Sequence, residues 1–157
     1  MTKNEAIAKL AELAAVWYGN SKQHAVFAAY NKFNGYNKLA EKFAEEASEE
    51  FAEANEAMNR LIELGCQPTD LATAIKTVEF DFSADPKEQL ELDLKYGTDD
   101  SAIQELSLLS QAFADDYITQ ELIQKWIKGE KEHIDWNRQH RQLIEKVGYD
   151  NYLLEML

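Results

Sequence analysis

Apolar residues recur at intervals of three and four along most of the chain, which is the periodicity of amphipathic helices. The pattern is clearest over residues 36–64 and over the segment that follows Asp116 and ends near residue 146. Both apolar stripes are interrupted by polar residues. The inward-facing positions are Tyr36, Ala40, Phe43, Ala47, Glu50, Ala54, Ala57 and Leu61 in the first stripe and Ile123, Trp126, Glu130, His133, Asn137, His140 and Ile144 in the second.

Local start and stop signals divide the chain into four long helices. Thr2 and Glu5 are spaced as a capping box and predict a first helix over residues 3–33. Asp85 is followed directly by a proline and predicts the start of a third helix over residues 86–113. The other boundaries are glycines at Gly35, Gly65 and Gly148, a long connection over residues 66–85, and a short terminal helix over residues 149–157.

The lengths of the connections predict how these helices are arranged. A short link makes neighbouring helices antiparallel, whereas the long connection over residues 66–85 can carry the chain back along the bundle. The second and third helices would then run parallel. We therefore expect one all-α domain over residues 1–157: a four-helix bundle with one long crossover and a short C-terminal fifth helix.

The polar residues inside the apolar stripes are the strongest indication of chemistry. Glu130 and His133 are three residues apart and share one helical face, as do Glu50 and Glu53. Buried carboxylates are costly unless they are paired or bind a cation. Carboxylates and imidazole suit iron, manganese or zinc, so these four residues predict a metal site. In the alternative, Glu130 and His133 hydrogen-bond in a polar core layer without a metal, and Glu53 turns to solvent.

Composition narrows the range of functions. The chain has 29 acidic residues and 16 basic ones, which argues against nucleic acid as a partner. No apolar run reaches the roughly 20 residues of a membrane-spanning helix, and the first residues do not resemble a signal peptide. The single cysteine, Cys66, cannot form an internal disulfide. We therefore expect no membrane association and a reduced, cytoplasmic location.

The last third of the chain resembles the end of a bacterioferritin. The resemblance implies a ferritin-like bundle, non-haem iron as the metal, and a cage for iron storage assembled from identical subunits, each with a ferroxidase centre. The family's ligands fall on Glu50, Glu130 and His133, and Glu53 replaces a family histidine. The matching segments are residues 130–136, 143–148 and 151–153, with Asp116 and Tyr117 upstream and residues 35–68 aligned almost without gaps.

Two departures from the family pattern predict an incomplete centre. Trp17 and Gly97 occupy the positions of the two bridging glutamates, so we expect a mononuclear or weak iron site. We hypothesise that the Trp17 indole fills the space over Gly97 and donates to Glu50 or Glu130. The family's haem-binding methionine falls on Phe51, so no haem is expected.

Five further acidic or histidine residues are candidate ligands. His24 lies two turns from the tryptophan on the same face, so it either completes a displaced site or is a satisfied core histidine. Asp93 and Asp100 flank the missing third-helix ligand by about a turn. Glu45 and Glu49 match positions of an inner-surface iron site in some bacterioferritins, and a solvated acidic helix face explains them equally well.

Three functional classes follow from these observations. The first is a ferritin-family iron protein that oxidises Fe(II) to Fe(III) and stores it. The second is a non-catalytic ferritin-like structural or interaction protein that keeps the bundle without the di-iron site. The third is a helical interaction protein with Trp126, Tyr149 and Tyr152 at a partner surface.

Overall fold

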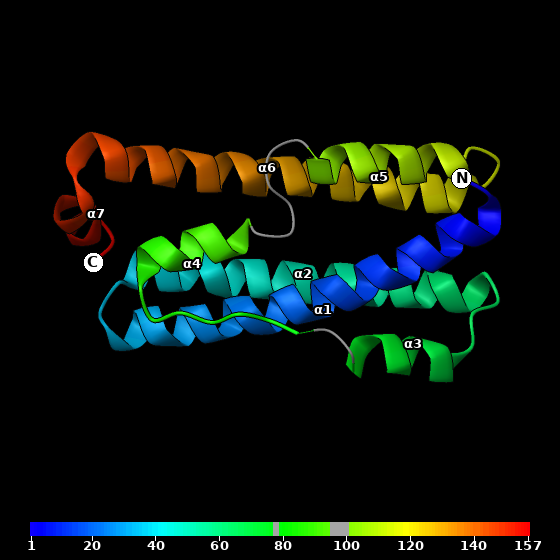
Figure 1. Ribbon diagram of the computed structural model, residues 1–157, viewed down its shortest axis with the longest axis horizontal. Coiled ribbons are helices and arrows are strands. Elements are labelled where there is room, and N and C mark those ends of the chain that lie inside the picture. Colours follow the sequence, from blue (N-terminus) through cyan, green and yellow to red (C-terminus); the bar gives the residue numbers. More distant parts are fainter. Residues whose placement is uncertain (77–78, 95–100) are drawn as a thin grey trace.

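The computed structural model describes residues 1–76, 79–94 and 101–157. Those residues form helices and connections without a β-strand, which confirms the all-α prediction (Figure 1). Gly97 and Asp100, two of the positions singled out in the sequence, lie outside the described residues. The helices are α1 (Lys3–Phe33), α2 (Asn37–Glu63), α3 (Pro68–Lys76), α4 (Pro86–Asp93), α5 (Ser101–Ala112), α6 (Tyr117–Val147) and α7 (Tyr149–Glu155).

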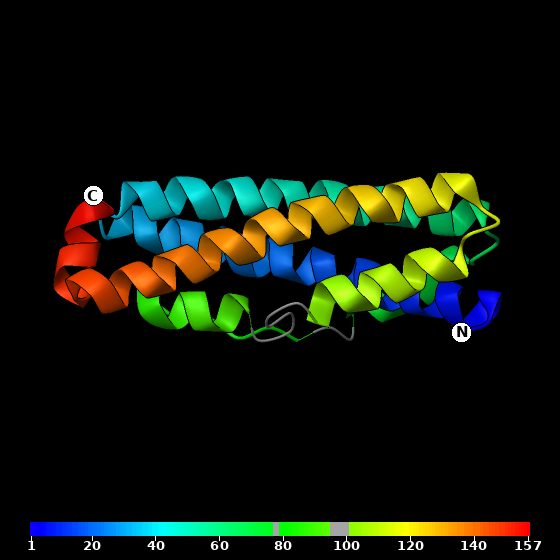
Figure 2. The same ribbon diagram turned by 90° about the horizontal axis from the view of Figure 1, so that it is seen from above.

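The long helices form the predicted bundle with one crossover. α1 and α2 are antiparallel neighbours, and α6 lies beside the pair (Figures 1 and 2). The connection after α2 contains the short helix α3 and then returns along the bundle before α4 begins. α2, α4 and α5 therefore run in one direction, and α1 and α6 run in the other. Among the described helices, none combines the length and apolar composition that a membrane crossing requires.

The prediction of one continuous third helix over residues 86–113 is wrong. α4 ends at Asp93, where the backbone N–H of Leu94 bonds to the carbonyl of Leu92, and α5 begins at Ser101. The break is established at Leu94, whose φ of -95° and ψ of 2° depart from helical values, while residues 95–100 lie outside the described part of the chain. The two short helices follow each other along the bundle, so together they occupy the place of the expected long helix (Figure 2).

The bundle core consists of two apolar clusters with a polar layer between them. One cluster gathers around Trp17, Leu61 and Trp126, and the other around Phe27 and Phe43. α7 closes the second cluster with Tyr152, whose hydroxyl lies 2.9 Å from Nδ1 of His140. Trp126 and Tyr152 are buried, so the predicted partner surface that contained them is wrong.

Asp116 connects the start of α6 to α2. Its carboxylate accepts hydrogen bonds from the Thr119 backbone N–H (3.2 Å) and from the Arg60 guanidinium (2.8 Å). Burial works against ionisation, but the bonds from Thr119 and Arg60 outweigh it and lower the pKa of Asp116 to about 2. Asp116 therefore acts both as a helix cap and as an ion-pair partner.

We expect Asp116→Ala to lower the free energy of unfolding by about 2 kcal/mol, because the cap and the ion pair are lost together. Urea denaturation followed by circular dichroism measures the change. The neighbouring Asp115→Ala is the matched control: that side chain is 76% exposed and pairs only with Lys3 among its described contacts. The control should change stability by less than about 0.5 kcal/mol. Equal losses in the two variants would contradict the capping role.

Gly19 allows the crossover to pack directly on α1. A Cβ at this buried position would overlap the ring of Phe80, which lies in the returning connection. Beside it, the Gln23 amide donates to the Asp81 carbonyl at 2.8 Å. The missing side chain therefore makes the space that the Phe80 ring fills.

We expect Gly19→Ala to destabilise the protein by about 1–3 kcal/mol, because the Phe80 ring must leave its position. The same substitution in a Phe80→Ala background should cost little or even stabilise, since alanine favours a helix over glycine. Urea denaturation of the four proteins in this cycle tests the contact. Equal effects of Gly19→Ala in both backgrounds would show that the two residues are not coupled.

Candidate metal centre

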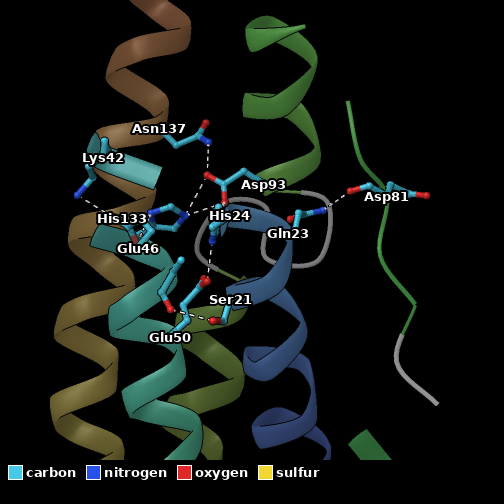
Figure 3. Close-up of polar contacts among 11 residues, drawn as sticks. Ser21, Gln23, His24, Lys42, Glu46, Glu50, Asp81, Asp93, His133 and Asn137 are labelled. Carbon is cyan, nitrogen blue, oxygen red and sulfur yellow. Dashed lines mark hydrogen bonds and ion pairs between the residues drawn. The ribbon is translucent and has the colours of Figure 1, made fainter. Parts of the chain in front are cut away.

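The polar layer brings together side chains from four helices (Figure 3). α1 contributes its only histidine, α2 two glutamates one turn apart, α4 its last residue, and α6 a histidine and an asparagine. The helical spacing of three or four residues within α2 and α6 places each of these pairs on one face. The residues are His24, Glu46, Glu50, Asp93, His133 and Asn137.

His24 lies between two carboxylates. Its Nδ1 is 2.6 Å from Oε2 of Glu50, and its Nε2 contacts Oδ1 of Asp93. The ring is 1% exposed and stacks on Phe43. Burial alone would lower the pKa of His24, but the charges of Asp93 and Glu50 outweigh it and raise the pKa to about 10. His24 is therefore an imidazolium at neutral pH.

His133 is held in the same way from the opposite side of the bundle. Its Nε2 lies 3.0 Å from Asp93, and its Nδ1 lies 3.0 Å from Oε2 of Glu46. The contact with Glu46 is an ion pair without hydrogen-bond alignment. Burial opposes the charge on His133, yet Asp93 and Glu46 keep its pKa well above the usual range. Lys42 completes the chain of contacts at 2.7 Å from the other Glu46 oxygen.

Asp93 is the centre of the cluster. Both histidine rings aim Nε2 at its carboxylate, and the Asn137 amide donates to Oδ2 at 2.7 Å. Burial would raise its pKa, but the two histidines hold the pKa of Asp93 far below the usual range. The Asp93 side chain is 1% exposed, so this ionised carboxylate depends on its neighbours for all its stabilisation.

Glu53 and Glu130 form a second, different part of the centre. Glu53 faces α6, and its Oε1 would lie 3.3 Å from a Cβ added at Gly129. Burial and the neighbouring charge of Glu130 raise the pKa of Glu53 to about 8, and burial also raises the pKa of Glu130. Within the described part of the chain, neither carboxyl has a hydrogen-bond or ion-pair partner. These are the groups that a bound cation would stabilise most.

These positions decide between the two interpretations of the polar stripe. Glu53 points into the bundle, so its predicted alternative orientation toward solvent is wrong. His133 contacts Asp93 and Glu46 in a buried polar layer, as the alternative expected for this histidine, whereas Glu130 has no hydrogen-bond partner among the described residues. Glu50, Glu53, Glu130 and His133 do converge on one small pocket between α2 and α6.

The weaker candidates divide into inward and outward residues. His24 and Asp93 lie in the cluster, whereas Glu45 and Glu49 are exposed on α2. Glu45 lies 3.6 Å from Lys42, as expected for a solvated helix face.

Trp17 packs edge-on against Trp126, with ring centroids 4.9 Å apart. Its described contacts include no hydrogen bond to Glu50 or Glu130, contrary to the hypothesis drawn from the sequence.

Glu46 and Asn137 belong to the cluster but were not proposed as site residues from the sequence. Glu46 is 4% exposed, although it lies one position off the apolar stripe of α2. The available signal was its spacing, four residues before Glu50 and seven before Glu53, which places all three on one face. Asn137 stood in the α6 stripe, four residues after His133, and is fully buried.

The donor set fits a first-row transition metal. Imidazole nitrogens and carboxylate oxygens meet in one buried layer, and these are the donors that iron, manganese and zinc accept. A cavity of about 70 Å³ lies alongside, lined by Trp17, Glu50, Asp93, Glu130 and His133 among others. This space is large enough for water or for an exchangeable ligand beside the donors.

Comparison with known proteins identifies the family. Residues 7–147 match the ferritin-like domain. A bacterial ferritin of Neisseria meningitidis is 30% identical over 126 residues, which cover 78% of this chain and 77% of the relative. A bacterioferritin of Brucella melitensis is 31% identical over 119 residues, which cover 75% of this chain and 71% of the relative. With its crossover bundle and its central polar layer, the chain belongs to the ferritin-like domain family.

Proposed function

We propose that this protein is an iron-binding member of the ferritin family, with ferrous iron as its substrate. The observation that carries the proposal is the convergence of buried carboxyls and two imidazoles from four helices on one layer. The relatives named bacterial ferritin and bacterioferritin support the choice of iron. Glu53 and Glu130, which are costly to ionise without a cation, supply a reason for binding.

The proposed reaction is oxidation of Fe(II) to Fe(III) by dioxygen, in which four Fe(II) ions give up one electron each and one dioxygen takes up these electrons and four protons to form two water molecules. Glu50, Glu53, Glu130 and His133 would receive the substrate ion in the pocket between α2 and α6. Trp17 fills the position of one bridging glutamate and packs on Trp126, so the centre is incomplete on the α1 side. We therefore propose one iron per subunit, without haem.

The proposal extends to assembly and location. We propose a homo-oligomer, in the form of a storage cage, in the cytoplasm. Exposed carboxylates such as Glu45 and Glu49 would then supply an acidic face to oxidised iron. The net charge of -13 is consistent with a cavity that attracts cations. Native mass spectrometry tests this part: a monomer or dimer would rule out a storage cavity.

The second candidate is a ferritin-like protein without redox chemistry, and one observation favours it. His24, His133 and Lys42 supply positive charge to Asp93, Glu46 and Glu50, so these carboxyls have counter-charges without a bound cation. The chain would then use its bundle for assembly or for another partner. Buried ion networks of this kind are retained in some proteins for structural specificity.

Aerobic titration of the metal-free protein with Fe(II) separates the two candidates. The ferric absorbance and the iron retained per subunit are measured together. Under the proposed function, oxidation is faster than in buffer, saturates near one iron per subunit and is lost in Glu130→Ala. Oxidation no faster than in buffer, with no retained iron, would favour the non-catalytic protein.

A further inference from the structure

We infer that the cation site of this chain is formed by His24, Asp93 and His133, displaced along the bundle from the positions that the family resemblance indicates. One divalent transition-metal ion would bind there through two imidazoles and one carboxylate. The inference rests on the proposed function only for the identity of the ion as iron. The site itself is argued from the geometry of the cluster.

The three donors already converge. One ligand atom from each residue lies within 4.8 Å of the other two. Both rings direct Nε2 at Asp93, and for His133 the distance to either carboxylate oxygen is 3.0 Å. A first-row ion holds nitrogen and oxygen at about 2.0–2.2 Å, so neighbouring ligands of one ion are roughly 3 Å apart. The ion would take the place of the protons that the Nε2 atoms share with Asp93.

The outer contacts have the pattern of a metal site. Nδ1 of His24 is 2.6 Å from Glu50, and Nδ1 of His133 is 3.0 Å from Glu46. A histidine that binds a metal through one nitrogen usually has its other nitrogen held by a carboxylate or carbonyl, which fixes the ring. Glu46 and Glu50 occupy that place here. We therefore assign Glu50 as a positioning residue and not as a ligand.

The carboxylate of Asp93, the third proposed ligand, is also held in place by its neighbours. Asn137 donates to Oδ2 of Asp93 at 2.7 Å, and the same amide nitrogen lies 3.0 Å from the carbonyl of Leu90. Asn137 is thus anchored on α4 by the Leu90 carbonyl, and it orients the Asp93 carboxylate from α6 before any ion arrives. A preformed ligand set of this kind loses little conformational freedom on binding.

The site also has an open side. Asp93 and His133 line the cavity of about 70 Å³, together with Glu130 and Trp17. Two imidazoles and one carboxylate leave coordination positions free, as in non-haem iron sites and catalytic zinc sites. Water or a dioxygen-sized ligand could reach the ion from this cavity.

X-ray absorption spectroscopy on the unmodified full-length protein gives the first test. Metal-free protein receives one equivalent of Zn²⁺, and the histidine contribution to the spectrum is counted. The displaced site has two imidazole ligands, whereas the family positions Glu50, Glu53, Glu130 and His133 offer one. Two imidazoles are expected. One imidazole with several carboxylates, or no bound Zn²⁺, would overturn the inference.

Variants then identify the ligands by titration with Co²⁺, followed by its visible absorption. His24→Gln and Asp93→Asn should raise the Kd by at least about 100-fold, and Glu50→Gln by about 10-fold to 100-fold. His140→Gln and Asp135→Asn are matched controls outside the cluster and should bind like the wild type. Far-ultraviolet circular dichroism checks that each variant is folded. If a variant does not fold, the X-ray absorption experiment on the unmodified protein still tests the inference.

The outcomes separate this inference from the proposed function. If Zn²⁺ and Co²⁺ bind through two imidazoles while iron is neither oxidised nor retained, the site is correct and the iron function fails. If iron is oxidised, and Glu53→Gln abolishes metal binding while His24→Gln leaves it unchanged, the iron function stands and the displaced site is wrong.

Discussion

Asp93→Asn is expected to lower the free energy of unfolding of the metal-free protein by about 3 kcal/mol, because it leaves two buried imidazoles without their shared counter-charge. Asp93 pairs with both His24 and His133. Asparagine keeps the size and the bond to Asn137 but removes the negative charge. The histidines must then lose their protons or remain charged while buried with one carboxylate each in place of two, and either change costs free energy.

Two measurements check this expectation. Urea denaturation at pH 7 gives the loss of stability, with Asp135→Asn as a matched control. The Asp135 side chain is 41% exposed and pairs with Lys131 on the same helix, so its loss should cost less than about 0.5 kcal/mol. A proton NMR titration should show that the pKa of His24, which is about 10 with Asp93 in place, is lower in the variant. A stable variant with an unchanged His24 titration would contradict the central role of Asp93.

The helices themselves were largely predictable, because their signals are local. The capping box of Thr2 and Glu5 predicted a helix over residues 3–33, and α1 has those bounds. Gly65 predicted the end of the second helix to within two residues of the observed end of α2 at Glu63. The break between α4 and α5 was missed because a favourable start at Asp85 and a continuing apolar pattern say little about the end of a helix.

The site was only partly predictable, because it depends on how helices are shifted along one another. A stripe on α6 identifies Glu130 and His133 as inward, but the ring of His133 contacts Asp93 and Glu46. Alignment to the family directed attention on α1 to Trp17, whereas the histidine in the centre lies two turns further along. Periodicity cannot resolve a shift of whole turns, each about 5.4 Å along the axis, because every turn of an inward stripe is equivalent.

The metal-free protein is expected to be most stable near pH 5 and to lose stability as the pH rises to 10. Folding raises the pKa of Glu53 from 4.5 to about 8, so above pH 4.5 the folded state binds more protons than the unfolded state, and stability falls through pH 8. His24 adds stability that is fully present below pH 6.5, the unfolded pKa of histidine, and that is lost as the pH rises through about 10. Each group contributes up to about 1.4 kcal/mol per pH unit.

The acid side of the curve has the opposite sign. Folding lowers the pKa of Asp93, Glu46 and Asp116, so their contribution is present above the unfolded values and is lost as the pH falls below about 4. Urea denaturation at intervals from pH 3 to pH 10, in the presence of a chelator, measures the whole curve. The maximum should lie near pH 5, where the acid-side contributions are nearly complete and the decline caused by Glu53 has only begun.

The substitution Glu53→Gln tests how much the ionisation of Glu53 contributes to the loss of stability at alkaline pH. It should leave stability near pH 5 almost unchanged and raise it by about 2 kcal/mol at pH 8, after allowance for solvent screening of this half-buried group. The amide cannot ionise, so the repulsion with Glu130 disappears. Glu45→Gln, on the exposed face of the same helix, should follow the wild-type curve at every pH. If the curves of wild type and Glu53→Gln coincide at pH 8, Glu53 is not a strained carboxyl, and the layer does not need a cation to offset it.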